Sequence, residues 1–428
     1  MSDVFRKAMT NKLPRLPPTR APWADEPERE VAETEDLEDE EGDSLADLGA
    51  MLPPPTKYGG TDLSPLSASS FFSQALEVSP PSSPCTFRVY LTPPTSTPSS
   101  QQRPGGSDSG GSGSSKNGTY LVCHHGGGAS GLSFAALARE VKSKSDGEMG
   151  VLAFDCRGHG KTQTEGSLAV ERDLSLPTLL SDFLGLVEHM FPDPKAAPSL
   201  VLLGHSMGAA PILSAAPILQ SKGYTVPGVV VLDVVEGTAV EALPLMKGII
   251  AQRPSSFRSV VDAIHWHLSS HTIRDTDAAR VSVPSLLVPA PDPGPSSALD
   301  SQHHLGPKGK QVWRTDLLAT EPYWEDWYRG LSSRFLAAKC ARLLVLAGQE
   351  RLDKELMVGQ MQGKFQLEVM QDTGHYLHED NPSSLASTLV QFWRRNTRVL
   401  VLPPKIGQTG VSGLKNSAPA VVRRVGEE

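Results

Sequence analysis

Three hallmarks of membrane, secreted and nucleic-acid-binding proteins are absent from this sequence of 428 residues. No apolar run approaches the ~20 residues that a membrane-spanning helix needs. Residues 1–18 contain no apolar stretch behind their basic residues, so no secretory signal is expected. The net charge is −8, which argues against the basic surface of a nucleic-acid-binding protein.

Cysteine is scarce as well, and its four positions are Cys85, Cys123, Cys156 and Cys340. They are widely spaced and form no CxxC pair, and two of them fall in apolar, strand-like runs. This usage predicts reduced thiols in a cytoplasmic or nuclear protein. It indicates neither a disulfide framework nor a zinc site.

Four segments are too polar to contribute to a hydrophobic core. Residues 1–68 are rich in proline, serine and acidic residues, and residues 92–118 have the Gly/Ser/Pro composition of a flexible linker. Residues 284–309 and the tail 399–428 are similarly biased. We expect all four to be disordered or mobile, the second and third as insertions within a single domain over residues 69–398.

Between these segments, apolar strand-like runs alternate with helical patterns. The predicted strands are residues 71–78, 85–92, 119–128, 150–160, 199–206, 226–237, 339–348 and 364–372, and the predicted helices are 132–143, 174–191, 208–220 and 383–396. The first two strands predict an opening hairpin. Near-continuous Val/Leu runs alternating with helices predict an α/β fold with a mainly parallel central sheet flanked by helices.

The run GHSMGAA, residues 204–210, fits the pattern G-x-S-x-G and directly follows an apolar strand. A strand, a serine between glycines and a helix start together form a nucleophile elbow, which places Ser206 on a strained turn. Gly204 and Gly208 allow the strand and the helix to pass closely. An isolated match would more often be an ordinary loop serine, so the interpretation depends on the rest of the chain.

Serine hydrolysis also needs a histidine base and an acid that orients it, in the chain order Ser, Asp or Glu, His in α/β-hydrolases. His375, behind a glycine after the last strand, is the predicted base, and His378 is its competitor. The residues alone leave the acid open. Asp233 follows one strand with Glu236 three residues beyond, whereas Asp353 follows the next strand and is slightly favoured by position.

The tetrahedral intermediate needs backbone donors for its oxyanion. We expect one from the N–H of Met207, the residue after the nucleophile, and a second from Gly127 in the HHGGG loop. Residues 240–335 break the strand and helix alternation with helical segments at 242–257 and 259–274. The aromatic cluster of this region is Trp313, Tyr323, Trp324, Trp327 and Tyr328. A cap inserted over the active-site end of the sheet would explain the region.

Several stretches together resemble the protein phosphatase methylesterase family, whose members remove the methyl ester from the C-terminal leucine of the protein phosphatase 2A catalytic subunit. The stretches are HHGGGASGLSFAALA, FDCRGHGKT, LLGHSMGAAP, LDVVEGTAVEALPLM, ARVSVP, WRTDLLATEPYWEDWYRGLSSRFL, LLVLAGQERLDKELMVGQMQGKFQLEV and GHYLHED. DVVEGTA and QMQGKFQ are the most specific. The resemblance runs from about Phe71 to Thr397, apart from the two insertions.

The resemblance implies an α/β-hydrolase fold with a helical cap and a serine esterase that needs neither a metal nor an organic cofactor. The acid of that family is the aspartate of DVVEGTA, so the implied triad is Ser206, Asp233 and His375, and Asp353 takes a lesser structural or substrate-side role. Ester hydrolysis would proceed through an acyl-enzyme on Ser206.

The family also implies that the phosphatase 2A catalytic subunit is both substrate and docking partner, with the cap, residues 240–335, shaping a groove for its C-terminal tail. The triad is expected to assemble when the phosphatase docks. Two alternatives remain open. One is a generic small-molecule carboxylesterase or lipase of the same fold, and the other is a catalytically silent regulator that binds the phosphatase.

Overall fold

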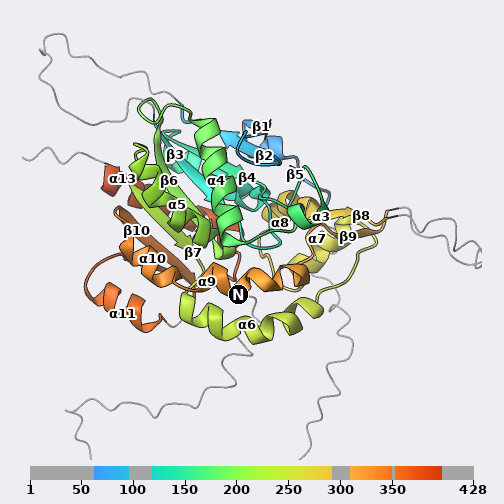
Figure 1. Ribbon diagram of the computed structural model, residues 1–428. Helices are drawn as coiled ribbons and strands as arrows, with labels where there is room; N and C mark the ends of the chain where they lie inside the picture. The colour runs from blue at the N-terminus through green and yellow to red at the C-terminus, as the bar shows by residue number, and fades with distance from the viewer. Residues whose placement is uncertain (1–61, 96–117, 292–308, 349–351, 398–428) are drawn as a thin grey trace, which may run out of the picture.

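In the computed structural model, the structure describes residues 62–95, 118–291, 309–348 and 352–397 (Figure 1). Most of each segment predicted to be disordered lies outside the described residues. The parts concerned are residues 1–61, 96–117, 292–308 and 398–428. Among the helices that are described, none is long and apolar enough to cross a membrane.

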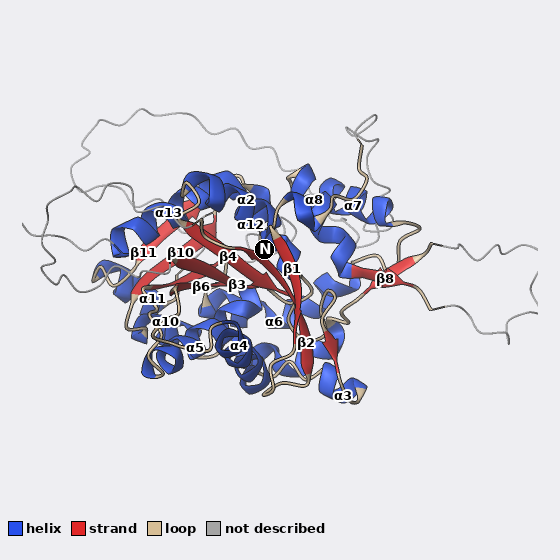
Figure 2. Ribbon diagram, turned by 90° about the horizontal axis from the view of Figure 1, so that it is seen from above, coloured by secondary structure: helices blue, strands red, loops and turns tan. Residues whose placement is uncertain are grey.

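A single twisted sheet runs through the middle of the described structure (Figure 2). Its nine strands are β1 (Gln74–Val78), β2 (Cys85–Thr92), β3 (Thr119–His124), β4 (Met149–Phe154), β5 (Gln163–Thr164), β6 (Ser199–His205), β7 (Gly228–Leu232), β10 (Ala341–Ala347) and β11 (Gln366–Met370). Their order is β1-β2-β4-β3-β6-β7-β10-β11, with β5 on β2. The contacts β1–β2, β2–β4 and β2–β5 are antiparallel and the others are parallel, so the predicted mainly parallel sheet and its opening hairpin are confirmed.

Helices cover both faces of the sheet (Figure 2). On one side lie α2 (Ala135–Lys144), α12 (Leu377–Asp380) and α13 (Pro382–Thr397), and on the other α4 (Leu176–Met190), α5 (Ala209–Ser221), α10 (Leu331–Ala337) and α11 (Lys354–Met361). The short helices η1 (Ala68–Ser70), η2 (Gly131–Phe134), η3 (Ser206–Gly208) and α3 (Leu168–Glu171) lie in the connections.

The central strand β6 shows why its sequence is apolar throughout. Val201 and Leu203 belong to the core cluster that contains Phe134 on one side, whereas Leu200 and Leu202 belong to the cluster of the opposite side. A parallel strand buried on both faces has no solvent side, so it reads as a continuous run instead of an alternation.

The cap lies between β7 and β10. Its elements are α6 (Glu236–Ala251), α7 (Val260–Ser269), α8 (Thr276–Ser282), η4 (Val283–Leu286), β8 (Leu287–Pro289), β9 (Gln311–Trp313), η6 (Leu318–Tyr323) and α9 (Trp324–Tyr328). Strands β8 and β9 pair with each other. Residues 284–289 fall in the segment that we expected to be mobile, but they form part of η4 and all of β8.

Element boundaries differ from the expectation at the entrance to the cap. The predicted strand 226–237 ends at Leu232, and α6 begins at Glu236, six residues before the predicted helix. The backbone of Asp233 has a φ of 49°, a left-handed conformation that cannot continue a strand. This turn ends the strand and delivers the chain into the cap.

Candidate active site

Ser206 lies on a sharp turn between β6 and the start of α5. Its φ of 51° is unusual for a residue with a side chain, and such strain costs about 1–3 kcal/mol. A Cβ on Gly204 would lie 2.4 Å from the carbonyl oxygen of Gly208, and a Cβ on Gly208 would lie 2.3 Å from that of His124. Only glycines permit this approach, and the result is the geometry expected of a nucleophile elbow.

Asp233 and His375 contact each other directly, although 142 residues separate them. The His375 Nδ1 and the Asp233 Oδ2 lie 2.8 Å apart, and the other carboxylate oxygen accepts the N–H of Ala347 at 2.7 Å. The Asp233 side chain is fully buried, whereas the His375 side chain is 24% exposed. An Nδ1 that donates to Asp233 leaves Nε2 as the basic nitrogen of the ring.

The pKa of Asp233 reflects these partners. Burial acts to raise the pKa of this carboxyl, but the hydrogen bond and the charge of His375 help to hold it below its ordinary value. A carboxylate that stays ionised beside an imidazole stabilises the imidazolium form, which is what a general base needs when it takes up a proton.

The two other acidic candidates have partners other than His375. Glu236 accepts the backbone N–H groups of Gly330 at 2.8 Å and Ser332 at 3.1 Å. Asp353 caps α11 by accepting the N–H of Leu356 at 2.9 Å, and it also accepts the Ser332 hydroxyl. Both side chains therefore hold the start of a helix.

His378, the competitor for the base, lies in the core. It belongs to the separate short helix α12 and not, as expected, to the start of the final helix. Its ring stacks on Phe134 with centroids 4.7 Å apart and lies 4.5 Å from the ring of His205. Burial lowers the pKa of His378 to about 3, so it is neutral and packed at ordinary pH.

A cavity of about 890 Å³ opens between the ends of the strands and the cap. Ser206, Asp233 and His375 all line it, together with Gly127 and the cap residue Tyr328. Apolar side chains of α6 form much of the remaining wall, namely Ala239, Ala242, Leu243, Met246, Ile249 and Ile250.

Tyr328 lies beside Ser206, a proximity that the sequence did not reveal. Burial raises the pKa of the Tyr328 phenol, and hydrogen bonding with Ser206 acts in the opposite direction. Within the part of the chain that the structure describes, no hydrogen bond joins Ser206 to His375. The aromatic cluster of the cap was the one signal for Tyr328, but it did not indicate which ring reaches Ser206. Its neighbours Trp324 and Trp327 are buried in the core.

The predicted oxyanion donors lie on adjoining loops. A Cβ on Gly127 would lie 3.9 Å from the Met207 sulfur, and Met207 itself is at the first turn that leads into α5, where backbone N–H groups lack helical partners. The next amide along, that of Gly128, donates to His159 Nε2 at 2.9 Å and is already used. Gly127 thus remains the candidate of this loop.

The comparisons with known proteins place the chain in a family. The model of the alpha/beta hydrolase family matches residues 121–388. A protein phosphatase methylesterase 1 of Cryptococcus neoformans var. neoformans serotype D (strain B-3501A) is 64% identical over 432 residues, covering all of both chains. A relative of the same name from Schizosaccharomyces pombe is 45% identical and covers 69% of this chain and 80% of its own. The chain belongs to the protein phosphatase methylesterase 1 family.

Membership in this family makes the chain a carboxylic ester hydrolase of α/β-hydrolase fold. Among solved structures, that of E-2-(acetamidomethylene)succinate hydrolase matches with a TM-score of 0.53 and 16% identity, covering 75% of this chain and 98% of its own. At that identity the likeness shows the fold alone.

One group of buried side chains has the spacing of a metal site. The potential ligand atoms of His125, Cys156 and His159 lie within 4.8 Å of one another. Each imidazole nitrogen already has a backbone partner, however. His125 pairs with the Gly126 carbonyl at 2.8 Å and with the Cys156 N–H at 2.9 Å, and His159 pairs with the Arg157 carbonyl at 2.8 Å besides Gly128. Burial lowers the pKa of His159 to about 4, so the cluster is a neutral brace for the glycine loop.

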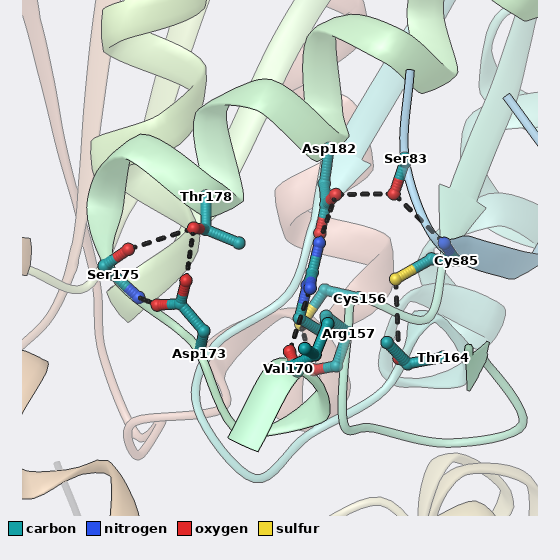
Figure 3. Close-up of polar contacts among 10 residues, drawn as sticks. All are labelled: Ser83, Cys85, Cys156, Arg157, Thr164, Val170, Asp173, Ser175, Thr178 and Asp182. Carbon is teal, nitrogen blue, oxygen red and sulfur yellow. Dashed lines mark hydrogen bonds and ion pairs between the residues drawn. The ribbon is translucent and has the colours of Figure 1, made fainter. Parts of the chain in front are cut away.

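The loop that carries His159 is itself tied to α4 by a buried ion pair (Figure 3). Arg157 donates from Nε and Nη2 to the two carboxylate oxygens of Asp182, both at 2.8 Å, and from Nη1 to the Val170 carbonyl at 2.9 Å. Ser83 adds a hydroxyl donor to Asp182 at 2.7 Å. Bidentate pairs of this kind fix geometry as well as charge, so the loop whose His159 contacts the HHGGG segment is itself held in place.

Proposed function

We propose that this protein removes the methyl ester from the C-terminal leucine of a protein phosphatase 2A catalytic subunit, through an acyl-enzyme on Ser206. The observation that carries the proposal is the contact of His375 with Asp233 at the wall of the cavity that Ser206 also lines. The name shared by the full-length relatives supports a phosphatase as the substrate.

In the first half of the reaction, His375 Nε2 takes the proton of the Ser206 hydroxyl as the oxygen attacks the ester carbonyl carbon. Asp233 holds the ring and stabilises the imidazolium. The backbone N–H groups of Met207 and Gly127 donate to the oxyanion, an interaction that typically contributes about 3–4 kcal/mol for each donor. The tetrahedral intermediate collapses, the C–O bond to the methoxy group breaks, and His375 returns the proton, which releases methanol.

In the second half, His375 takes a proton from water, and the hydroxide attacks the acyl carbonyl. Collapse breaks the bond to Ser206, whose oxygen regains the proton from His375. The product is a C-terminal carboxylic acid, which loses its proton to water and becomes the free carboxylate, and the enzyme returns to its original state. None of these steps requires a metal or an organic cofactor.

The hydroxyl of Ser206 must face His375 for this step, whereas in the structure the side chain of Tyr328 lies beside it. We propose that binding of the phosphatase on the cap, which carries Tyr328, brings Ser206 and His375 into contact. Catalytic hydrogen bonds often form fully only in the substrate complex.

The test is to incubate the protein with purified methylated phosphatase catalytic subunit and to follow its C-terminal peptide by mass spectrometry. We expect loss of one methyl group and release of methanol with the wild type, and no loss with Ser206→Ala. Turnover of small esters without any demethylation would favour a generic carboxylesterase. If an active-site fluorophosphonate fails to label Ser206 even when phosphatase is present, the protein is a silent regulator.

A further inference from the structure

Arg253, just beyond the end of α6, lines the same cavity as the nucleophile. Its guanidinium carbon lies 3.6 Å from the centroid of the Trp313 ring. Among the described residues, the guanidinium has no hydrogen-bond acceptor and no carboxylate as an ion-pair partner.

A guanidinium carries five N–H donors, and a second arginine of the same protein shows how they can be used within the fold. The donors of Arg157 are taken up by Asp182 and Val170, whereas those of Arg253 have no such partner among the described residues. Burial lowers the pKa of Arg253, whereas the hydrogen bond and charge of Asp182 leave the pKa of Arg157 raised.

The aromatic ring beneath Arg253 is firmly held. The indole N–H of Trp313 donates to the carbonyl of Pro254 at 2.7 Å, and its ring meets Phe257 and Trp266 edge-on at centroid distances of 5.3 Å and 6.0 Å. One face of the guanidinium is thereby occupied by a fixed ring. Its in-plane N–H donors are left for a ligand in the cavity.

Tyr376 links this position to the reacting groups. It follows His375, lies with its ring 5.5 Å from that of His375, and lines the cavity too. The charge of Arg253 acts on Tyr376, whose pKa burial raises and Arg253 lowers. A chain whose terminal ester reaches Ser206 can therefore extend past Tyr376 towards Arg253.

We propose that Arg253 is a specificity-determining residue, which binds the carboxylate of an acidic side chain located a few residues before the esterified terminus of the substrate. This inference rests on the proposed function, because it requires a peptide ester in the cavity. A planar guanidinium held on one face matches a single carboxylate through two parallel N–H donors.

The test uses short peptides that end in leucine methyl ester and carry one Asp, moved in turn through the positions before the leucine, each paired with the Asn peptide. Charge-assisted hydrogen bonds typically confer about 10- to 100-fold. We expect the wild type to favour Asp over Asn by that factor in kcat/KM at one position, with an effect mainly on KM. The Asp/Asn ratio should fall to about one in Arg253→Met and be partly kept in Arg253→Lys.

Two matched variants control the experiment. Arg329→Met removes an exposed arginine that pairs with Glu325 outside the cavity, and it should leave the ratio unchanged. Arg258 also lines the cavity, so a ratio that collapses in Arg258→Met but survives in Arg253→Met would overturn the assignment.

The outcomes separate this inference from the function on which it rests. Hydrolysis of the peptide esters with no Asp preference at any position overturns the role of Arg253 and leaves the esterase function standing. If a peptide ester with phosphoserine at that position is hydrolysed with a higher kcat/KM than the Asp peptide, the ligand of Arg253 is a phosphate and the proposed carboxylate is wrong. Turnover of a small phenyl ester with no hydrolysis of any peptide ester or of the methylated phosphatase contradicts the proposed function and the inference together.

Discussion

The carboxyl ends of β7 and β10 lie side by side in the sheet, yet the aspartates that follow them have different environments. Asp233 comes directly after β7, is fully buried and contacts His375. Asp353 comes six residues after the last residue of β10, is partly exposed and caps α11. Two acids at equivalent ends of neighbouring strands thus differ because one sits on a left-handed turn that directs its carboxylate across the sheet edge.

The position of an acidic residue directly after a strand does not by itself assign it a role. A buried carboxylate needs partners, and Asp233 has them in the Ala347 N–H and the His375 ring. A carboxylate at a helix N-terminus stabilises that helix, as Asp353 does. We expect the first acid to affect the rate and the second to affect stability.

The largest expected effect comes from replacing Ser206, the proposed nucleophile. Ser206→Ala should lower kcat by about 10⁵- to 10⁶-fold, as in other triads whose serine is removed, with KM little changed. The measurement is turnover of a small ester, and Ser214→Ala in α5 is the matched control, because the Ser214 hydroxyl donates to the Ala210 carbonyl of the same helix. Substantial turnover by Ser206→Ala would show that hydrolysis does not proceed through this serine, and neither Asp233 nor Asp353 could then be the acid of its triad.

A smaller effect is expected from replacing His159, which supports the glycine loop from the interior. His159→Phe leaves the Gly128 N–H without its acceptor, a loss of about 1–3 kcal/mol that we expect as a 10- to 100-fold lower kcat. His159→Gln offers another acceptor and should recover part of the rate. Equal kcat in the wild type and His159→Phe would show that the loop needs no such support.

The pH dependence of stability extends the comparison from acids to buried bases. Burial lowers the pKa of His124 and His159 to about 4. As the pH falls below about 6.5, these two imidazoles therefore become protonated in the unfolded state while they stay neutral in the native state. Stability should therefore fall as pH falls from about 6.5 to 4. Asp155, whose pKa burial raises to about 6, acts in the opposite direction.

His159→Gln isolates one of these groups. The free energy of unfolding, measured in urea at pH 7.0, 5.5 and 4.5, should fall less steeply with decreasing pH in this variant than in the wild type. The difference in slope should correspond to the uptake of up to one proton fewer on unfolding. Parallel pH profiles for the two proteins would contradict a neutral His159 in the native state.

The smallest expected effect falls on the second acid. Asp353→Ala removes the cap of α11 and should reduce the free energy of unfolding by about 1 kcal/mol. The thermal midpoint measures this loss, while kcat stays within a factor of about three. A stability unchanged by the substitution would remove the structural role assigned to Asp353.

Much of the fold was predictable from the sequence, because strands buried on both faces leave continuous apolar runs and the elbow needs two glycines around Ser206. The identity of the acid was not predictable from the residues alone, because position favoured Asp353 and the family resemblance was needed to select Asp233. The placement of Tyr328 beside Ser206 and the brace of His159 on Gly128 join segments far apart in the chain, so no local pattern encodes them. The catalytic roles themselves remain predictions.

The most direct test of the account compares Asp233→Asn with Asp353→Asn in one assay of kcat on a small ester. Loss of the acid that orients a triad histidine typically lowers kcat by about 10⁴-fold. We expect that loss for Asp233→Asn and a change of less than about threefold for Asp353→Asn. The reverse order would contradict it and would make Asp353 the acid.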